Sequence, residues 1–170
     1  RCGTPPNRPL IIPNSVMLNQ YDNPANPDAH YYGTGPEMWE QTDGKITLFI
    51  AGIGPAGTIS GTAKYLKEKN PQCTVVGVDP EGSILAKAFK REKWSWSDSH
   101  PYKVEGIGED FVPKNLLAQY IDDVVTVSDR DSFLMGRRLT REEGLFCGGS
   151  SGSAVAGALE YARERQLGKD

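Results

Sequence analysis

The stretch of residues 45–61 constrains the fold most, because in it an apolar segment passes through a glycine-rich loop into a segment with helical periodicity. Such a pattern is typical of a buried strand followed by a helix. Glycines let the backbone approach a ligand closely, and a helix start directs free N–H groups and the positive end of its dipole at an anion. The stretch therefore predicts a strand, a phosphate-binding loop and a helix in that order.

The rest of the chain continues this alternation. We expect strands at residues 46–51, 74–78, 123–127 and 145–147, and helices at residues 58–69, 128–143 and 150–166. Apolar or small residues recur at helical spacing in the first and last of these helices: Ile59, Ala63 and Leu66, then Ala154, Ala158 and Ala162. Strands that alternate with helices over short connections form a parallel sheet covered by helices. The predicted fold class is α/β, with a parallel twisted sheet flanked by helices.

Two regions fall outside this pattern. Residues 1–44 are rich in Pro, Asn and Gly and show little periodicity before residues 36–41, which we expect to form a helical turn or two. We expect residues 1–44 to wrap over an α/β unit formed by residues 45–170. The hydrophilic residues 86–103 contain Trp94 and Trp96, which indicate either a contact surface or a surface loop with one tryptophan tucked in.

Composition excludes several classes of function. The 170 residues carry a formal net charge of −3, which gives no electrostatic reason to expect nucleic acid or an anionic membrane as partner. No apolar run approaches the ~18–20 residues of a membrane span, and no segment resembles a signal peptide. Cys2, Cys73 and Cys147 have no C-x-x-C spacing, which argues against a disulfide framework and a metal site. We expect reduced thiols in a cytoplasmic protein.

The glycine-rich loop also permits a dinucleotide-binding interpretation. Residues 52–57 match G-x-G-x-x-G, and Asp79 follows at the end of the next strand, where a NAD-binding Rossmann fold keeps the acid that binds the ribose. However, Pro80 directly after Asp79 indicates that this acid belongs to a turn. The loop is not a Walker A motif, because no Gly-Lys-Ser/Thr follows it.

Two further glycine-containing loops add to the candidate site. Ser150 lies in a Gly/Ser cluster between a strand and a helix, where its hydroxyl either caps the helix or donates a hydrogen bond to a heteroaromatic nitrogen. Residues 105–109 form a third loop, suited to close over a small substrate. Strand-to-helix junctions of a parallel sheet lie at one edge, where α/β folds bind ligands. One phosphate cup plus one contact to a ring nitrogen fits a compact ring cofactor better than a nicotinamide.

Several segments together resemble the cysteine synthase/cystathionine β-synthase family of fold-type II enzymes that use pyridoxal phosphate. These segments are residues 13–15, 20–30, 58–69, 77–85, 104–113 and 143–153. The resemblance implies the large-domain portion of the fold-type II (tryptophan synthase β-like) fold. It also implies β-replacement chemistry, in which serine condenses with homocysteine to cystathionine, in an enzyme that commonly forms a homodimer; cysteine synthase-like activity is an alternative.

The same resemblance assigns roles to particular residues. The cofactor phosphate would be held by Gly54, Pro55, Ala56, Gly57 and Thr58. The amino-acid substrate site would be lined by Gln20, Tyr21, Gly106, Ile107, Gly108 and Glu109. Ser150 would face the pyridine nitrogen, and its neutral hydroxyl would leave this nitrogen unprotonated, which favours β-elimination.

The chain departs from the family pattern in several ways. No lysine lies in the context of the family's Schiff-base lysine, which belongs to an upstream part, and residues 1–7 meet residues 12–15 as though a piece were missing. Glu109 replaces a tyrosine that the family usually carries. Pro55 and Ala56 replace family residues of the phosphate loop. Pro55 lacks an N–H, so we expect phosphate binding to be weaker by ~1–3 kcal/mol, and Ala56 is strained if its φ is positive. A non-catalytic binding module of the same fold is the alternative.

Overall fold

Three parallel strands form the centre of the molecule. In the computed structural model, which describes residues 13–168, β1 (Leu48–Gly52), β2 (Thr74–Pro80) and β3 (Asp123–Val127) follow one another in the order β1-β2-β3. The register places Ile50 opposite Val76 and Val78 opposite Val125. The predicted parallel sheet is confirmed. The expected discontinuity between residues 7 and 12 lies outside the described residues.

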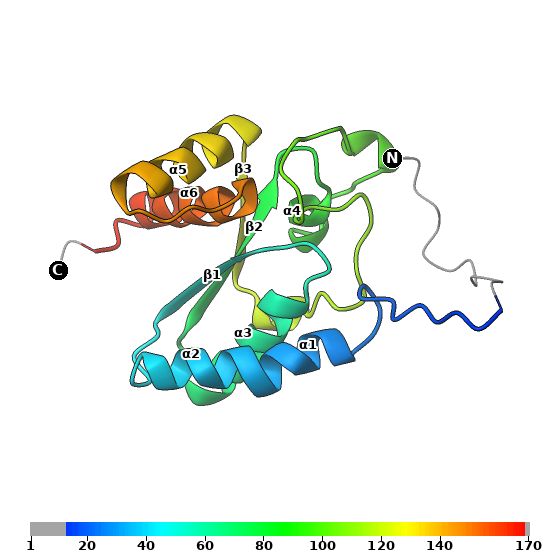
Figure 1. The fold of residues 1–170 in the computed structure, drawn as a ribbon, viewed down its shortest axis with the longest axis horizontal. Coiled ribbons are helices and arrows are strands. Elements are labelled where there is room, and N and C mark those ends of the chain that lie inside the picture. Colours follow the sequence, from blue (N-terminus) through cyan, green and yellow to red (C-terminus); the bar gives the residue numbers. More distant parts are fainter. Residues whose placement is uncertain (1–12, 169–170) are drawn as a thin grey trace.

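Helices cover both faces of this sheet (Figure 1). On one face α3 (Gly57–Lys69) packs against β1, and its predicted stripe of Ile59, Ala63 and Leu66 is fully buried. On the other face α6 (Gly149–Glu164) contacts all three strands and is covered by α5 (Asp129–Glu142). Sheets of parallel strands need such cover because their side chains are apolar on both sides. The predicted α/β fold class, with helices flanking the sheet, is confirmed.

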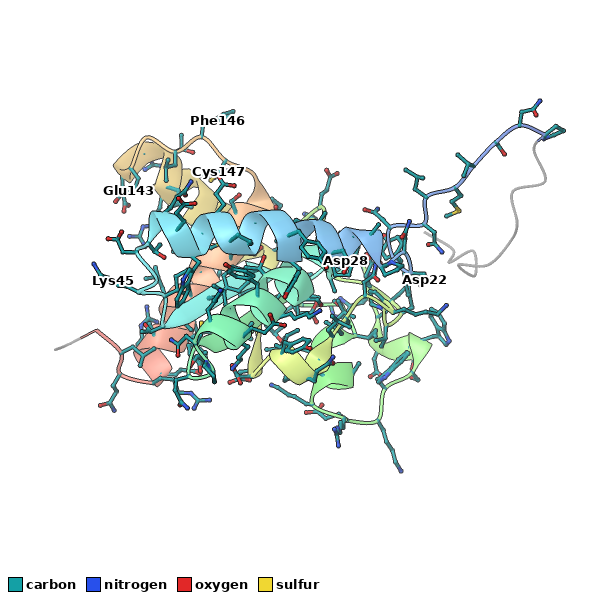
Figure 2. The ribbon with its side chains drawn as sticks, turned by 90° about the horizontal axis from the view of Figure 1, so that it is seen from below. Asp22, Asp28, Lys45, Glu143, Phe146 and Cys147 are labelled. Atoms are coloured by element: carbon teal, nitrogen blue, oxygen red, sulfur yellow. The ribbon has the colours of Figure 1, made fainter. Side chains whose placement is uncertain are left out.

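The predicted strand at residues 145–147 is wrong. These residues form an extended loop between α5 and α6, and Phe146 is 95% exposed. Figure 2 shows Phe146 and Cys147 at the outer edge of the molecule. The apolar run has the composition of a strand, but no strand of the described residues lies beside it to complete its hydrogen bonds.

The predicted alanine stripe of α6 is displaced by one residue. The buried positions are Gly152, Ser153, Gly157 and Tyr161, while Ala154, Ala158 and Ala162 are only partly buried. A Cβ at Gly157 would lie 2.9 Å from a methyl group of Val78. The helix therefore turns its glycine toward the sheet, because the residue with no side chain permits the closest approach.

A long helix replaces the one or two turns expected before β1. The segments α1 (Ala25–Ala29), η1 (His30–Thr34, a π-helix) and α2 (Gly35–Gln41) follow one another without interruption. They lie along α3, with Asp28 near one end and Lys45 beyond the other (Figure 2). The apolar periodicity is weak because the buried residues of α1 and α2 are Pro27 and Gly35 rather than large side chains.

The hydrophilic region of residues 86–103 forms a surface loop. It begins within α4 (Leu85–Phe89) and contains the 3-10 helix η2 (Trp96–Asp98); a further 3-10 helix, η3 (Ala118–Tyr120), precedes β3. Trp94 packs against the core, whereas Trp96 is 66% exposed. This arrangement matches the interpretation with one tryptophan tucked in. Within residues 13–168, no helix is both long and apolar enough to cross a membrane.

Candidate functional site

The predicted loops meet around one cavity at the carboxyl end of β1. The cavity has a volume of about 540 Å³ and lies between the start of α3, the start of α6 and the loop that carries Gly106. Nine of the predicted site residues line it: Gln20, Gly54, Pro55, Ala56, Gly57, Thr58, Gly106, Ile107 and Ser150. Residues from four separate parts of the sequence are thus brought to one place.

The floor of the cavity is the uncapped start of α3. This helix begins at Gly57 directly after the loop, and no side chain among residues 13–168 caps it. The first N–H groups of a helix have no partner inside the helix, so those of α3 remain free for a ligand. Together with the helix dipole they favour a bound anion.

Ala56 carries the strain that the sequence predicted. Its φ of +68° lies in the left-handed region, where an L-residue costs ~1–2 kcal/mol. Its side chain is buried in the core below the cavity. The position requires the conformation that a glycine adopts freely, and the chain retains that conformation with an alanine.

The loop of residues 106–108 is fixed to the phosphate loop. The Gly108 N–H donates to the Ile53 carbonyl over 2.6 Å. A Cβ at Gly54 would lie only 2.6 Å from the Gly106 carbonyl oxygen, so only glycine fits there. The two loops therefore form one rigid wall of the cavity.

Three predicted substrate residues do not line this cavity: Tyr21, Gly108 and Glu109. Gly108 is drawn toward Ile53 by its hydrogen bond. The Tyr21 ring makes an edge contact with Phe111, with the ring centroids 5.1 Å apart. Burial raises the pKa of Glu109 above its ordinary value, and the hydrogen bond from the Tyr21 side chain only partly opposes this rise. The Glu109 carboxyl group therefore pairs with Tyr21 and does not line the cavity.

Ser150 and Ser153 have different surroundings although both lie in the first turns of α6. The Ser153 hydroxyl is buried and bonds to Ser132 Oγ (2.7 Å) and the Gly149 carbonyl (3.1 Å). The Ser150 hydroxyl lines the cavity, does not cap α6, and has no hydrogen-bond partner among residues 13–168. Ser153 is therefore structural, and Ser150 can bond to a ligand.

Two lining residues, Asn26 and His30, were missed by the sequence-based site prediction. Asn26 Nδ2 donates to the Gln20 carbonyl over 2.8 Å, and its Oδ1 occupies the space that a Cβ of Gly57 would take. His30 Nε2 lies 3.1 Å from Thr58 Oγ1. Both come from the long helix before β1, and the resemblance of residues 20–30 to the family was the sequence signal that covered them.

Asp79 does not take part in this cavity. Its side chain is fully buried, and its Oδ2 accepts a hydrogen bond of 2.8 Å from the Ala86 N–H. Burial raises its pKa to about 6, against the opposing effect of hydrogen bonds from Ser83 and nearby backbone N–H groups. A ribose-binding acid must reach its ligand. The position of Asp79 therefore argues against the dinucleotide interpretation.

The comparison with protein families decides between these interpretations. The family model described as "Pyridoxal-phosphate dependent enzyme" matches residues 9–170. The chain belongs to the pyridoxal-phosphate-dependent enzyme family. This membership confirms the resemblance found in the sequence and identifies pyridoxal phosphate as the cofactor that the family uses.

The curated relatives of this pyridoxal-phosphate-dependent chain carry related names. It is 50% identical to the cystathionine beta-synthase of Dictyostelium discoideum and 49% identical to that of Mus musculus, over 93% of its own length. It is 40% identical to cysteine synthase A of Escherichia coli over 89% of its length. It spans 31%, 28% and 47% of these three relatives, respectively.

The cavity fits the cofactor of this family. Its volume lies within the ~300–1,000 Å³ of small-molecule sites. The uncapped start of α3 suits the phosphate, and the unpartnered Ser150 hydroxyl suits the pyridine nitrogen. Among the residues that the structure describes, no cluster of His, Cys, Asp or Glu could hold a metal ion.

Proposed function

We propose that this chain provides the phosphate and ring contacts of a pyridoxal-phosphate enzyme that carries out β-replacement, condensing serine with homocysteine to cystathionine. The observation that carries the proposal is the joint placement of the uncapped α3 start and the unpartnered Ser150 hydroxyl in one cavity. The names of the two cystathionine beta-synthase relatives support the reaction. Residues 45–170 then form the cofactor-binding large domain, over which residues 1–44 wrap.

We assign particular residues of the chain a role in binding the cofactor or the substrate. The backbone N–H groups at the start of α3 and the Thr58 hydroxyl bind the phosphate. Ser150 would donate to the pyridine nitrogen and keep it unprotonated, while Gln20 and Ile107 line the same cavity. When bound, the cofactor supplies the electron sink for loss of the β-substituent. We place Tyr21, Gly108 and Glu109 in the substrate site as supports of the Gly106–Ile107 wall.

The proposal extends to the setting of the reaction. A cytoplasmic location agrees with Cys73 and Cys147, which are free thiols in the described part of the chain. We also propose a homodimer, on the resemblance to the family alone. Measurement of the molecular mass in solution checks the second point, and a mass equal to that of one subunit would contradict it.

The test is the visible absorption spectrum of the full-length protein with pyridoxal phosphate. We expect an absorption band of protein-bound cofactor that changes when serine is added, and formation of cystathionine when homocysteine follows. Use of sulfide in place of homocysteine separates this reaction from that of a cysteine synthase. If no bound-cofactor band forms, the chain is a non-catalytic binding module and the proposal is wrong.

Substitution of Pro55 tests the phosphate loop itself. Pro55→Ala adds one N–H to the cavity wall, and a charge-assisted hydrogen bond contributes ~1.5–3 kcal/mol. We therefore expect Pro55→Ala to bind pyridoxal phosphate at least about tenfold more tightly than the unsubstituted protein does, as measured by equilibrium dialysis. Pro36→Ala, which removes a proline from the start of α2, serves as the control and should leave the affinity unchanged. An unchanged affinity in Pro55→Ala would show that residue 55 does not contact the phosphate.

A further inference from the structure

His30 links the phosphate-binding helix to the helix that packs on it. Its Nε2 lies 3.1 Å from Thr58 Oγ1, in the first turn of α3, and its Nδ1 lies 2.9 Å from Thr34 Oγ1, at the end of η1. Both ring nitrogens are thus engaged by hydroxyl groups. His30 and Thr58 also line the cavity, so the link reaches the ligand site.

The position of the His30 ring is fixed by the packing of the two helices. At Gly61 of α3, a Cβ would lie 2.9 Å from the Cβ of His30 and would overlap the Pro27 carbonyl oxygen. The backbone of α1 and the side chain of His30, at the start of η1, therefore rest directly on α3. Within η1, which is a π-helix, the side chain of Thr34 bonds to the ring of His30 four residues earlier. Interruptions of this kind are frequent at functional sites.

The hydrogen-bond chain has two possible directions. Burial lowers the pKa of His30, so the ring is neutral at ordinary pH and carries one donor and one acceptor nitrogen. If Nδ1 holds the proton, Nδ1 donates a hydrogen bond to Thr34 Oγ1, and Nε2 accepts a hydrogen bond from the Thr58 hydroxyl. That hydroxyl then has no proton left to donate to a ligand. If Nε2 holds the proton, it donates to Thr58 Oγ1, and the Thr58 proton is free to point into the cavity.

We propose that His30 is a positioning residue of the phosphate site, whose change of tautomer turns the Thr58 hydroxyl from a donor to the ring into a donor to the bound phosphate. The proposal rests on the proposed function, because the phosphate is that of the cofactor. The proton that leaves Nδ1 goes to water, and Nε2 takes a proton from water. The ring therefore stays neutral, and Thr34 and Thr58 keep their own protons and only rotate.

The energetic reason is the phosphate charge. A hydroxyl that donates to an ionised oxygen makes a hydrogen bond about twice as strong as one between neutral groups. The bound anion therefore favours the direction in which Thr58 donates to it and His30 donates to Thr58. In the absence of the anion the two directions differ only by bonds between neutral groups.

Nitrogen NMR of the full-length protein labelled with 15N-histidine tests this directly, at about pH 8, above the ordinary titration range of an imidazole. The His30 signals are those lost in His30→Gln. We expect the ring proton to move from Nδ1 to Nε2 as inorganic phosphate or pyridoxal phosphate saturates the site. A proton retained on Nδ1 in the complex, or a ring already protonated at Nε2 before the anion is added, would overturn the proposal.

Binding measurements on variants provide a second readout. Loss of the hydrogen bond from the Thr58 hydroxyl should weaken phosphate binding about tenfold in Thr58→Val. His30→Leu leaves this hydroxyl without the ring that positions it, and should weaken binding by up to the same factor. The double variant should bind no worse than Thr58→Val, because the two residues act through one hydroxyl. His30→Gln, whose amide can donate permanently to Thr58, should recover most of the affinity, whereas His100→Gln should match the unsubstituted protein.

The outcomes separate this inference from the proposed function. If the unsubstituted protein binds neither phosphate nor pyridoxal phosphate, the proposed function fails and the role of His30 fails with it. If it binds both and His30→Gln is as weak as His30→Leu, only the role of His30 is wrong, because a merely structural contact would show that result.

Discussion

Gly61→Ala is expected to lower the free energy of unfolding by about 2–3 kcal/mol, the upper part of the usual cost of overpacking. The new Cβ would overlap the Pro27 carbonyl oxygen and press on His30, and neither the carbonyl nor the ring can swing aside without moving the helix that carries it. The intrinsic gain of alanine over glycine in a helix, ~1 kcal/mol, is smaller than this cost. Urea denaturation measures the difference.

Gly33→Ala is the matched control. Gly33 lies in η1, and a Cβ there would meet nothing within 4 Å. The same chemical change should therefore leave the stability unchanged or raise it slightly. We also expect Gly61→Ala to weaken cofactor binding, because the displaced helix carries Asn26 and His30 away from the cavity. Equal stabilities of Gly61→Ala and Gly33→Ala would show that the close contact of η1 with α3 does not hold the site.

Asp79→Asn is expected to remove a large pH dependence of stability. Burial raises the pKa of Asp79 from an ordinary value of 3.8 to about 6, so the folded chain binds the proton more tightly than the unfolded chain. The contribution of Asp79 to the free energy of unfolding is fully present below pH 3.8 and is lost as the pH rises through about 6. Complete loss corresponds to about 3 kcal/mol.

The structural basis of this prediction is an incomplete set of hydrogen bonds. Asp79 Oδ2 accepts from the Ala86 N–H, whereas the buried Oδ1 has no hydrogen-bond partner in the described part of the chain. An uncharged side chain at this position has no proton to lose, so the unfolding free energy of Asp79→Asn should stay level between pH 4 and pH 7 apart from the contribution of other groups. Asp28→Asn, at an exposed position of α1, should keep the slope of the unsubstituted protein. Parallel slopes in all three proteins would mean that Asp79 does not titrate as described.

Much of the fold follows from local patterns in the sequence. The strand at residues 123–127 was predicted with its bounds, because β-branched residues between turn signals leave few alternatives. The start of α5 could be predicted because a serine cap is a local signal in the sequence. In the structure Ser128 accepts the expected hydrogen bond from the Asp131 N–H. The residues around the cavity were anticipated because strand-to-helix junctions of a parallel sheet share one edge.

The remaining features depend on contacts between distant segments. The helix of residues 25–41 buries Pro27 and Gly35 against α3, and neither residue contributes to a hydrophobic pattern. The hydrogen bond between His30 and Thr58 depends on this packing, so it could not be predicted from the sequence either. The apolar residues 145–147 show the converse, because a strand-like composition forms no strand without a neighbour to pair with. Tyr21 and Glu109 bond to each other and do not line the cavity, a pairing of distant residues that no local pattern signals.

The central claim is that the cavity at the start of α3 binds the phosphate of pyridoxal phosphate. The most direct test compares the affinities of the full-length protein for pyridoxal phosphate and for pyridoxal, which lacks the phosphate. Several charge-assisted hydrogen bonds should make pyridoxal phosphate bind at least about 100-fold more tightly. Affinities that agree within about twofold would contradict the account, since a free-energy difference that small leaves no role for the phosphate loop.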